Sequence, residues 1–211
     1  MSATHAGDGG RPPQNRARRV IVDAAVLVLA VVVITTAVRT IVGQAFYIPS
    51  LSMSPQLAVQ DRIVVSKLSY RLHGVRRGDI VVFDAPPQLA VPKPARSVPS
   101  RAAHAVLEGV NVVKPTTTEY VKRVVGLPGE QVSGRGGNLY VDDHLLVEPY
   151  LPAGLHTDDF GPVPVPAGRL FVMGDNRGAS FDSRRFGPID RSSVVGRAVV
   201  KVWPLGSACW L

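Results

Sequence analysis

Residues 119–129 read EYVKRVVGLPG, an apolar run that ends in a cluster of glycine and proline. Its β-branched residues and the breakers behind them predict a strand over Glu119–Val125. Side chains alternate across a strand, so Tyr120, Lys122 and Val124 share one face. The segment therefore predicts a β-strand that carries a lysine among apolar neighbours.

Similar short segments lie on both sides of this strand and predict a mostly β domain. Clusters of Gly, Pro and Asp separate them at the spacing of such domains. We expect Asp142-Asp143-His144 to form the turn of a hairpin. We also expect little helix after the N-terminal region, because no 3.6-residue period persists in the rest of the chain. The other predicted strands are Ala45–Ile48, Arg62–Ser66, Asp79–Phe83, Asn138–Val141, Leu145–Val147, Arg169–Met173 and Val194–Trp203.

The first forty residues predict a membrane anchor. Residues 1–19 are polar and basic, which predicts a disordered tail. Residues 20–38 are apolar except for Asp23, and at about 1.5 Å per residue a helix there spans a bilayer core. A cleaved targeting peptide is the alternative, but no small-x-small site closely follows. We expect a transmembrane helix over 20–39, a cytoplasmic N-terminus by the positive-inside rule, and an extracytoplasmic domain over 40–211.

Composition limits the remaining classes. Of 211 residues, 45% are hydrophobic, enough for a packed core, and the net charge is +8. The basic residues are scattered without an aromatic stripe, so the charge favours an anionic membrane over nucleic acid. A lone Cys209 offers no disulfide and no zinc site. Residues 86–118 are proline-rich and are expected to form a mobile excursion, with a short helix near 102–107.

Two further segments and the lysine strand carry candidate chemistry. Residues 48–55 read IPSLSMSP, where two prolines restrict the backbone around serines, as a nucleophile's rigid turn requires. Residues 174–184 read GDNRGASFDSR, a loop suited to fixed hydrogen bonds. The lysine flanked by apolar neighbours is a candidate general base, because burial lowers an ammonium pKa. A linker, a surface turn and an edge-strand lysine are the respective alternatives.

These three segments, in this order after one apolar helix, resemble the bacterial type I signal peptidases. The resemblance extends from the anchor to Arg197 and includes Arg77–Phe83. It implies a coiled antiparallel β-sheet of the kind shared by signal peptidases and LexA-like proteins. It also implies a membrane-bound serine endopeptidase that removes signal peptides after small residues at the first and third upstream positions.

The resemblance assigns roles residue by residue. Ser52 would be the nucleophile and Lys122 the general base, while Ser50 and the Ser52 N–H would receive the oxyanion. Ser180 would orient the lysine amine. An ion pair of Asp182 with Arg184 would hold the loop, with further support from Asp175. Phe46, Ile48 and Val121 would line the substrate pockets. The loop departs from the family's pattern at Gly178-Ala179, where a more polar pair is usual.

The expected partners are signal peptides of preproteins and membrane phospholipid, with no nucleic acid. We expect a monomer that uses neither a metal nor another cofactor, and the composition suggests an actinobacterial plasma membrane. A self-cleaving repressor-type Ser/Lys peptidase is the enzymatic alternative, disfavoured by the anchor. A tethered pseudoprotease is the non-enzymatic one, disfavoured because every proposed polar group is retained.

Overall fold

The computed structural model describes residues 14–42, 44–86, 89 and 119–211. Residues 1–13 of the predicted tail, most of the 86–118 excursion and its predicted helix lie outside the described residues. Contacts divide the chain into two units, residues 1–40 and 41–211.

The first unit is built on α1 (Gln14–Val42), a helix of 29 residues. Its large apolar side chains between Val20 and Val33 are exposed, most of them by more than half of their surface. Within the described part of the chain, no helix combines the length and apolarity required to cross a bilayer. The membrane-spanning helix predicted over 20–39 is therefore not confirmed.

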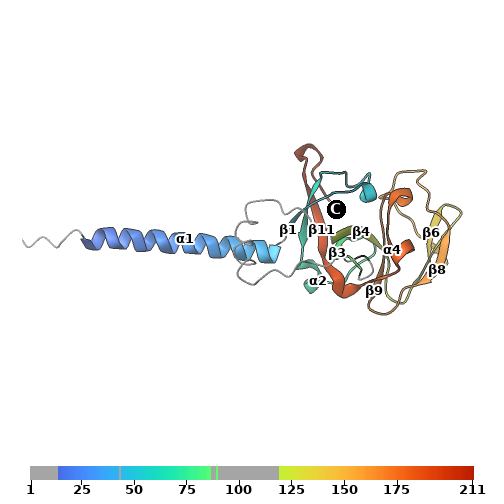
Figure 1. The fold of residues 1–211 in the computed structure, drawn as a ribbon, viewed down its shortest axis with the longest axis horizontal. Helices are drawn as coiled ribbons and strands as arrows, with labels where there is room; N and C mark the ends of the chain where they lie inside the picture. Colours follow the sequence, from blue (N-terminus) through green and yellow to red (C-terminus); the bar gives the residue numbers. More distant parts are fainter. Residues whose placement is uncertain (1–13, 43, 87–88, 90–118) are drawn as a thin grey trace, which may run out of the picture. The chain divides into compact units, whose positions relative to one another are not determined.

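The second unit is mostly β, as predicted, and contains two antiparallel sheets (Figure 1). Its helical segments within the described residues are short. The strands are β1 (Gln44–Tyr47), β2 (Arg62–Ser66), β3 (Ile80–Asp84), β4 (Glu119–Gly126), β5 (Gln131–Arg135), β6 (Asn138–Val141), β7 (His144–Leu145), β8 (Phe160–Pro164), β9 (Arg169–Met173), β10 (Ile189–Asp190), β11 (Val194–Trp203) and β12 (Cys209–Trp210). The helical segments are α2 (Ser69–Leu72), α4 (Ser183–Phe186), η1 (Leu51–Met53), η2 (Arg177–Ala179), η3 (Arg191–Ser193) and η4 (Leu205–Ser207).

The larger sheet has eight strands in the order β1-β2-β11-β3-β4-β9-β10, with β12 paired to β11. Strand β11 comes from the end of the chain and lies between β2 and β3, which follow one another in sequence. Strand β4 carries the 119–129 pattern and pairs with β3 along Glu119–Arg123. Strand β4 thus lies between β3 and β9, and its Lys122 is 2% exposed, so the lysine is not the solvent-facing residue of the alternative interpretation.

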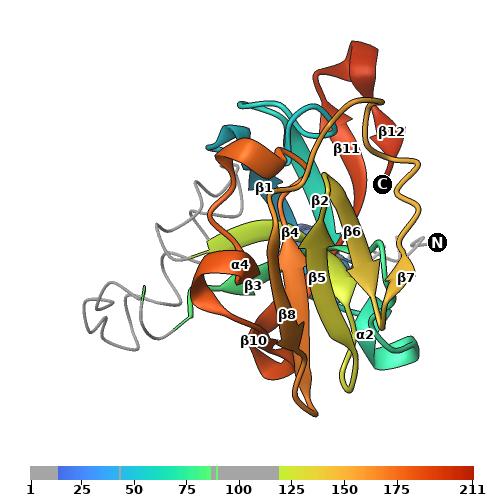
Figure 2. The same cartoon turned by 90° about the vertical axis from the view of Figure 1, so that its right-hand side faces the viewer.

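The second sheet has four strands in the order β7-β6-β5-β8, and Figure 2 shows it facing the viewer in front of β4. The predicted hairpin is present, since Tyr140 pairs with Leu145 and Val141 with His144. Its turn uses Asp142 and Asp143 at positive φ, which Asp tolerates better than most residues. The prediction placed His144 in the turn, but it lies in β7. Strands β5 and β8 were not predicted.

Three clusters of buried apolar residues hold the second unit together. The first cluster packs the apolar residues of the serine segment and its continuation against β1, β2 and β3. These residues are Ile48, Met53 and Leu57, each at most 2% exposed. A fully buried side chain of this kind contributes about 1.5–3 kcal/mol. The serine segment is therefore fixed to the sheet by its own apolar residues. The second cluster lies around Phe83 and Val172, and the third, around Phe171, joins the two sheets.

Candidate active site

The serine segment is an ordered loop and not a linker. Ser52 lies in η1, directly after Pro49 and Ser50. The Ile48 N–H donates to the Asp61 carbonyl at 2.9 Å, and the Gln60 N–H donates back to the Ile48 carbonyl at 2.9 Å. Met53 is buried directly behind Ser52. These hydrogen bonds join the two ends of the loop, and Met53 attaches it to the core. The Ser52 side chain therefore has a defined position.

The structure brings the two principal candidate residues together. Lys122 Nζ lies 2.6 Å from Ser52 Oγ, although 70 residues separate them in the chain. Ser50 Oγ lies 3.2 Å from Ser52 Oγ, and Lys122 Nζ also contacts the Val121 carbonyl at 3.0 Å. The Ser52 hydroxyl therefore lies within hydrogen-bonding distance of one amine, that of Lys122, and one other hydroxyl, that of Ser50.

Lys122 is 2% exposed, so its ammonium form is poorly solvated. Burial lowers the pKa of Lys122 to about 8, while the negative charges of Asp182 and Asp175 act in the opposite direction. An appreciable share of the amine is therefore neutral near physiological pH. A neutral amine at this distance has the chemistry of a general base for the serine hydroxyl.

Asp175 fixes the loop of residues 174–184 to β4. Its carboxylate is fully buried and accepts two hydrogen bonds from Arg123, at 2.8 Å from Nε and 2.7 Å from Nη2. The same guanidinium donates to the Gly78 carbonyl at 2.8 Å. The sequence assigned Asp175 only a general supporting position, and its partner is the residue that follows Lys122. The base and the loop opposite it are thus held by one bidentate ion pair.

Asp182 and Arg184 form an ion pair, with Arg184 Nε 2.9 Å from Asp182 Oδ1. The second carboxylate oxygen accepts from the Gly174 N–H at 3.0 Å. Burial raises the pKa of Asp182, but the Arg184 pair and the Gly174 N–H outweigh it and hold that pKa below its usual value. Asp182 therefore stays charged and ties α4 to the start of the loop.

Asn176 fixes the nucleophile's backbone, a role that the sequence did not assign. Its N–H donates to the Ser52 carbonyl at 3.1 Å, and its side-chain Nδ2 donates to the Leu51 carbonyl at 3.2 Å. The residue stood within the GDNRGASFDSR segment, but nothing in that pattern indicates a contact 125 residues away. Only the folded structure reveals this clamp on η1.

Ser180 does not make the predicted hydrogen bond to Lys122. Within the described residues, its Oγ is buried without a hydrogen-bond partner. It lies beside Gly174, since a Cβ placed on that glycine would clash with both Ser180 Oγ and the Ser52 carbonyl oxygen. Ser180 is therefore adjacent to the nucleophile's backbone, and its hydroxyl is close enough to Asp182 to help lower the pKa of that carboxyl.

This close approach gives a first prediction. Gly174→Ala should lower kcat about a hundredfold, because the new methyl group must displace either Ser180 or the Ser52 backbone, and small misplacements of reacting groups cost this much. Gly178→Ala is the matched control, because a Cβ there meets nothing within 4 Å and should leave kcat unchanged. Steady-state kinetics of both variants test the prediction. Equal activities would show that the loop accommodates the methyl group.

The proposed pocket residues lie in or against the core. Phe46 is 4% and Ile48 2% exposed, and Val121 packs against the same cluster while remaining half-buried. Of the three, Val121 has the most surface available to a ligand. Across the described ranges, no group of three or more His, Cys, Asp or Glu side chains is placed to hold a metal ion.

Comparison with known proteins assigns the chain to a family. The sequence model described as "Signal peptidase, peptidase S26" matches residues 21–203. The chain belongs to this signal peptidase family. "Signal peptidase I" of Leptolyngbya laminosa is 38% identical over 175 residues, which cover 82% of this chain and 75% of that protein.

Two more relatives extend this match. "Probable signal peptidase I-2" of Synechocystis sp. is 37% identical over 174 residues, covering 82% of this chain and 69% of that protein. "Signal peptidase I" of Mycobacterium tuberculosis is 37% identical over 222 residues, covering 91% and 76%. The resemblance inferred from the sequence is confirmed, and the chain is an enzyme of the signal peptidase I type.

Proposed function

We propose that this signal peptidase removes N-terminal signal peptides from exported preproteins by acyl transfer through a Ser52/Lys122 dyad. The observation that carries the proposal is the 2.6 Å separation of Lys122 Nζ from Ser52 Oγ, with the lysine side chain buried. A serine hydroxyl is too weakly acidic to attack a peptide bond unaided, and an adjacent base removes this limitation.

In the acylation half-reaction, Ser52 Oγ attacks the scissile carbonyl carbon and neutral Lys122 takes the hydroxyl proton. The carbonyl oxygen becomes an oxyanion, which the Ser50 hydroxyl and the Ser52 N–H receive. The C–N bond then breaks, and the Lys122 ammonium returns its proton to the leaving amine. The mature protein departs with a free N-terminus, and the signal peptide remains as an ester on Ser52.

In the deacylation half-reaction, Lys122 takes a proton from water, and the resulting hydroxide adds to the ester carbonyl. Collapse of this intermediate breaks the bond to Ser52 Oγ, and the proton on Lys122 returns to that oxygen. The signal peptide leaves as a carboxylic acid and the enzyme is restored. Ser180 would hydrogen-bond the amine during these steps after a small rotation of its buried hydroxyl, which lies beside Asp182.

The sheet offers two strand edges for an extended substrate. Strand β1 lies at the edge of the larger sheet. Among the described strands, β4 pairs with β3 along Tyr120–Lys122, and β9 joins β4 from Arg123 onward. The preprotein segment would add as a strand along these two edges. Phe46, Ile48 and Val121 would then line shallow apolar pockets that admit only small residues at the first and third upstream positions.

We further propose that the apolar helix over 20–39 attaches the enzyme to the plasma membrane, with the catalytic unit on the extracytoplasmic face. The exposed apolar side chains of α1 and the basic residues Arg18 and Arg19 before them support this arrangement. Retention in the membrane pellet after alkaline carbonate extraction tests it. Release into the supernatant would contradict it.

Mass spectrometry of a model preprotein incubated with the purified enzyme in detergent tests the main proposal. We expect one new N-terminus after a small-x-small sequence. A preprotein whose first upstream residue is replaced by a bulky one should remain uncut. Cleavage at unrelated positions, or none, would refute the proposed specificity or the proposed activity respectively.

The pKa of Lys122 predicts the pH dependence. Only the neutral amine accepts a proton, and the pKa of Lys122 lies near about 8, so kcat/KM should rise about tenfold per pH unit below this value and level off above it. The enzyme should therefore lose activity on acidification and not on mild alkalinisation. A pH profile measured on the model preprotein checks this. A profile with its rising limb near pH 6 would indicate a different base.

A further inference from the structure

Buried polar groups outside the dyad connect the catalytic loop, residues 174–180, to the second sheet. Arg177 is 2% exposed, and its guanidinium donates through Nη1 to Glu148 Oε2 at 2.8 Å and to Thr157 Oγ1 at 2.8 Å. Nη2 binds the other oxygen of Glu148, and Nε donates to the Gly174 carbonyl at 3.1 Å. One fully desolvated cation thus joins the segment between β7 and β8 to the loop.

Glu148 reaches a second arginine through Tyr150. The Tyr150 hydroxyl donates to Glu148 Oε1 at 2.5 Å, and the Tyr150 ring lies 3.9 Å from the centre of the Arg123 guanidinium. Burial and the Glu148 charge raise the pKa of Tyr150, so the phenol keeps its proton and remains a donor. Arg123 in turn binds Asp175. The Glu148 carboxylate therefore supports both Asp175 and Arg177, the residues on either side of Asn176.

Asn176 is the residue that holds the Ser52 and Leu51 carbonyls. We propose that Glu148 is a positioning residue for the reaction: its carboxylate, shared by Arg177 and Tyr150, sets the loop conformation in which Asn176 clamps the nucleophile. Glu148 touches neither Ser52 nor Lys122 in any contact described here. The proposal deepens the proposed function and rests on it.

A substitution at Glu148 should act on the loop in two ways. First, it leaves the buried Arg177 guanidinium short of an acceptor, so that it competes with Arg123 for Asp175. Second, it removes a compensating negative charge, and the unpaired Arg177 cation opposes the negative field that Asp175 exerts on Lys122. The pKa of Lys122 should then fall, which moves the rising limb of the pH profile to lower pH.

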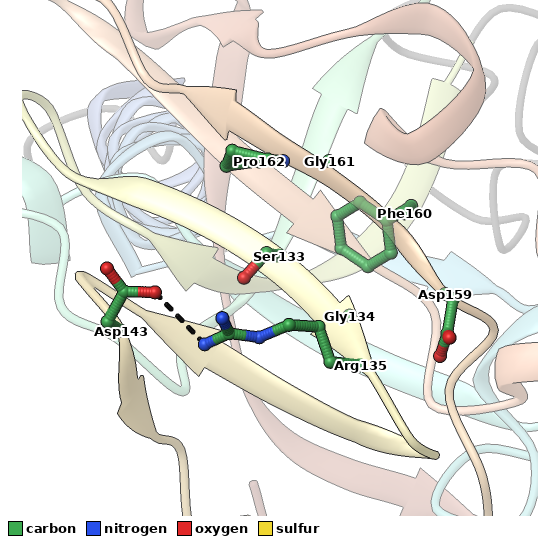
Figure 3. A pocket seen from close by; sticks show the side chains of 8 residues that line it. All are labelled: Ser133, Gly134, Arg135, Asp143, Asp159, Phe160, Gly161 and Pro162. Atoms are coloured by element: carbon green, nitrogen blue, oxygen red, sulfur yellow. Dashed lines mark hydrogen bonds and ion pairs between the residues drawn. The ribbon is translucent and has the colours of Figure 1, made fainter.

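The matched control is Asp143→Asn in the same sheet. Figure 3 shows Asp143 paired with Arg135, and both residues line a hollow of about 390 Å³. None of the proposed catalytic residues lines this hollow. This pair also joins a carboxylate to an arginine, at 3.0 Å, but its side chains are 55% and 78% exposed. Asparagine tolerates the positive φ of this position. The control therefore also removes one negative charge, but it leaves no buried cation without a partner.

The experiment compares wild type, Glu148→Ala, Glu148→Gln and Asp143→Asn as full-length proteins on one model preprotein. We expect Glu148→Ala to lower kcat about a hundredfold and Glu148→Gln about tenfold, with KM within about twofold because the proposed substrate edges lie elsewhere. The pH profile of kcat/KM should shift to lower pH in both variants. Asp143→Asn should match wild type. If Glu148→Ala does not fold, the isosteric Glu148→Gln decides.

Hydrogen exchange supplies a readout that does not depend on catalysis. In a Ser52→Ala background, Glu148→Ala or Glu148→Gln should accelerate exchange at amides 174–180 at least about tenfold, with β2 and β11 unchanged. Wild-type kcat, pH profile and exchange in both Glu148 variants would overturn the positioning role. A parallel loss of protection throughout the sheet would likewise overturn it in favour of a general stabilising role. A wild-type protein that cuts no preprotein would refute the proposed function alone, since the exchange result still stands.

Discussion

Lys122→Ala is expected to abolish preprotein cleavage, with kcat lower on the order of 10⁴-fold at neutral pH. The substitution removes the only amine within hydrogen-bonding distance of Ser52 Oγ in the described site, and an unassisted serine does not attack a peptide bond at a useful rate. Ser52→Ala should cost as much, and the double variant little more, because the two side chains act as one unit.

The measurement is single-turnover cleavage followed by mass spectrometry. Lys122→Met keeps most of the side-chain volume without the charge, so it should remain folded and be equally inactive. Cys209→Ala is the control, because this thiol is exposed and has no part in the scheme, and it should cleave at the wild-type rate. Full activity of either Lys122 variant at neutral pH would reject the dyad.

Arg123→Ala is expected to produce the largest loss of stability, about 3–5 kcal/mol in the free energy of unfolding. Asp175 is fully buried, and without its bidentate partner it would remain as an uncompensated carboxylate in the core. The substitution also removes the cation stacked on Tyr150. Chemical denaturation followed by tryptophan fluorescence measures the effect.

Arg135→Ala is the matched control for this loss. Its ion pair with Asp143 and its stacking on Tyr140 reproduce the same contacts on an exposed surface. Exposed pairs of this kind contribute about 0–1 kcal/mol, so the control should lie within that range. Similar losses in the two variants would mean that burial of the Arg123–Asp175 pair does not set its importance.

The strands with regular apolar patterns were predictable from the sequence. Arg62–Ser66, Arg169–Met173 and Val194–Trp203 have the predicted bounds, because β-branched runs flanked by breakers leave little ambiguity. Four strands were missed: β10 and β12 have only two residues each, and β5 and β8 lack that signal. Strand β8 reads FGPVP, and prolines are compatible with a strand only at an edge, where β8 lies. Strand β5 contains a glycine that packs against the Phe160 ring.

The candidate site divides along similar lines. The segments of Ser52 and Lys122 were candidates by local pattern, a proline-bounded serine and a lysine among apolar residues. The family resemblance then assigned the two roles. Glu148, Tyr150 and Asn176 were not candidates, because their roles consist entirely of contacts with residues far away in the chain. A side chain that positions another carries no mark of its partner in its own neighbourhood.

The place of β11 between β2 and β3 has a consequence for how the enzyme comes into being. A ribosome delivers β2 and β3 long before β11, yet these two strands are joined in the sheet only by pairing with β11. The larger sheet cannot close until β11 has been synthesised, so β2 remains unpaired with the part of the sheet that holds Lys122 until then. Contacts of such sequence separation also form slowly. A nascent chain therefore cannot complete the larger sheet before β11 has emerged.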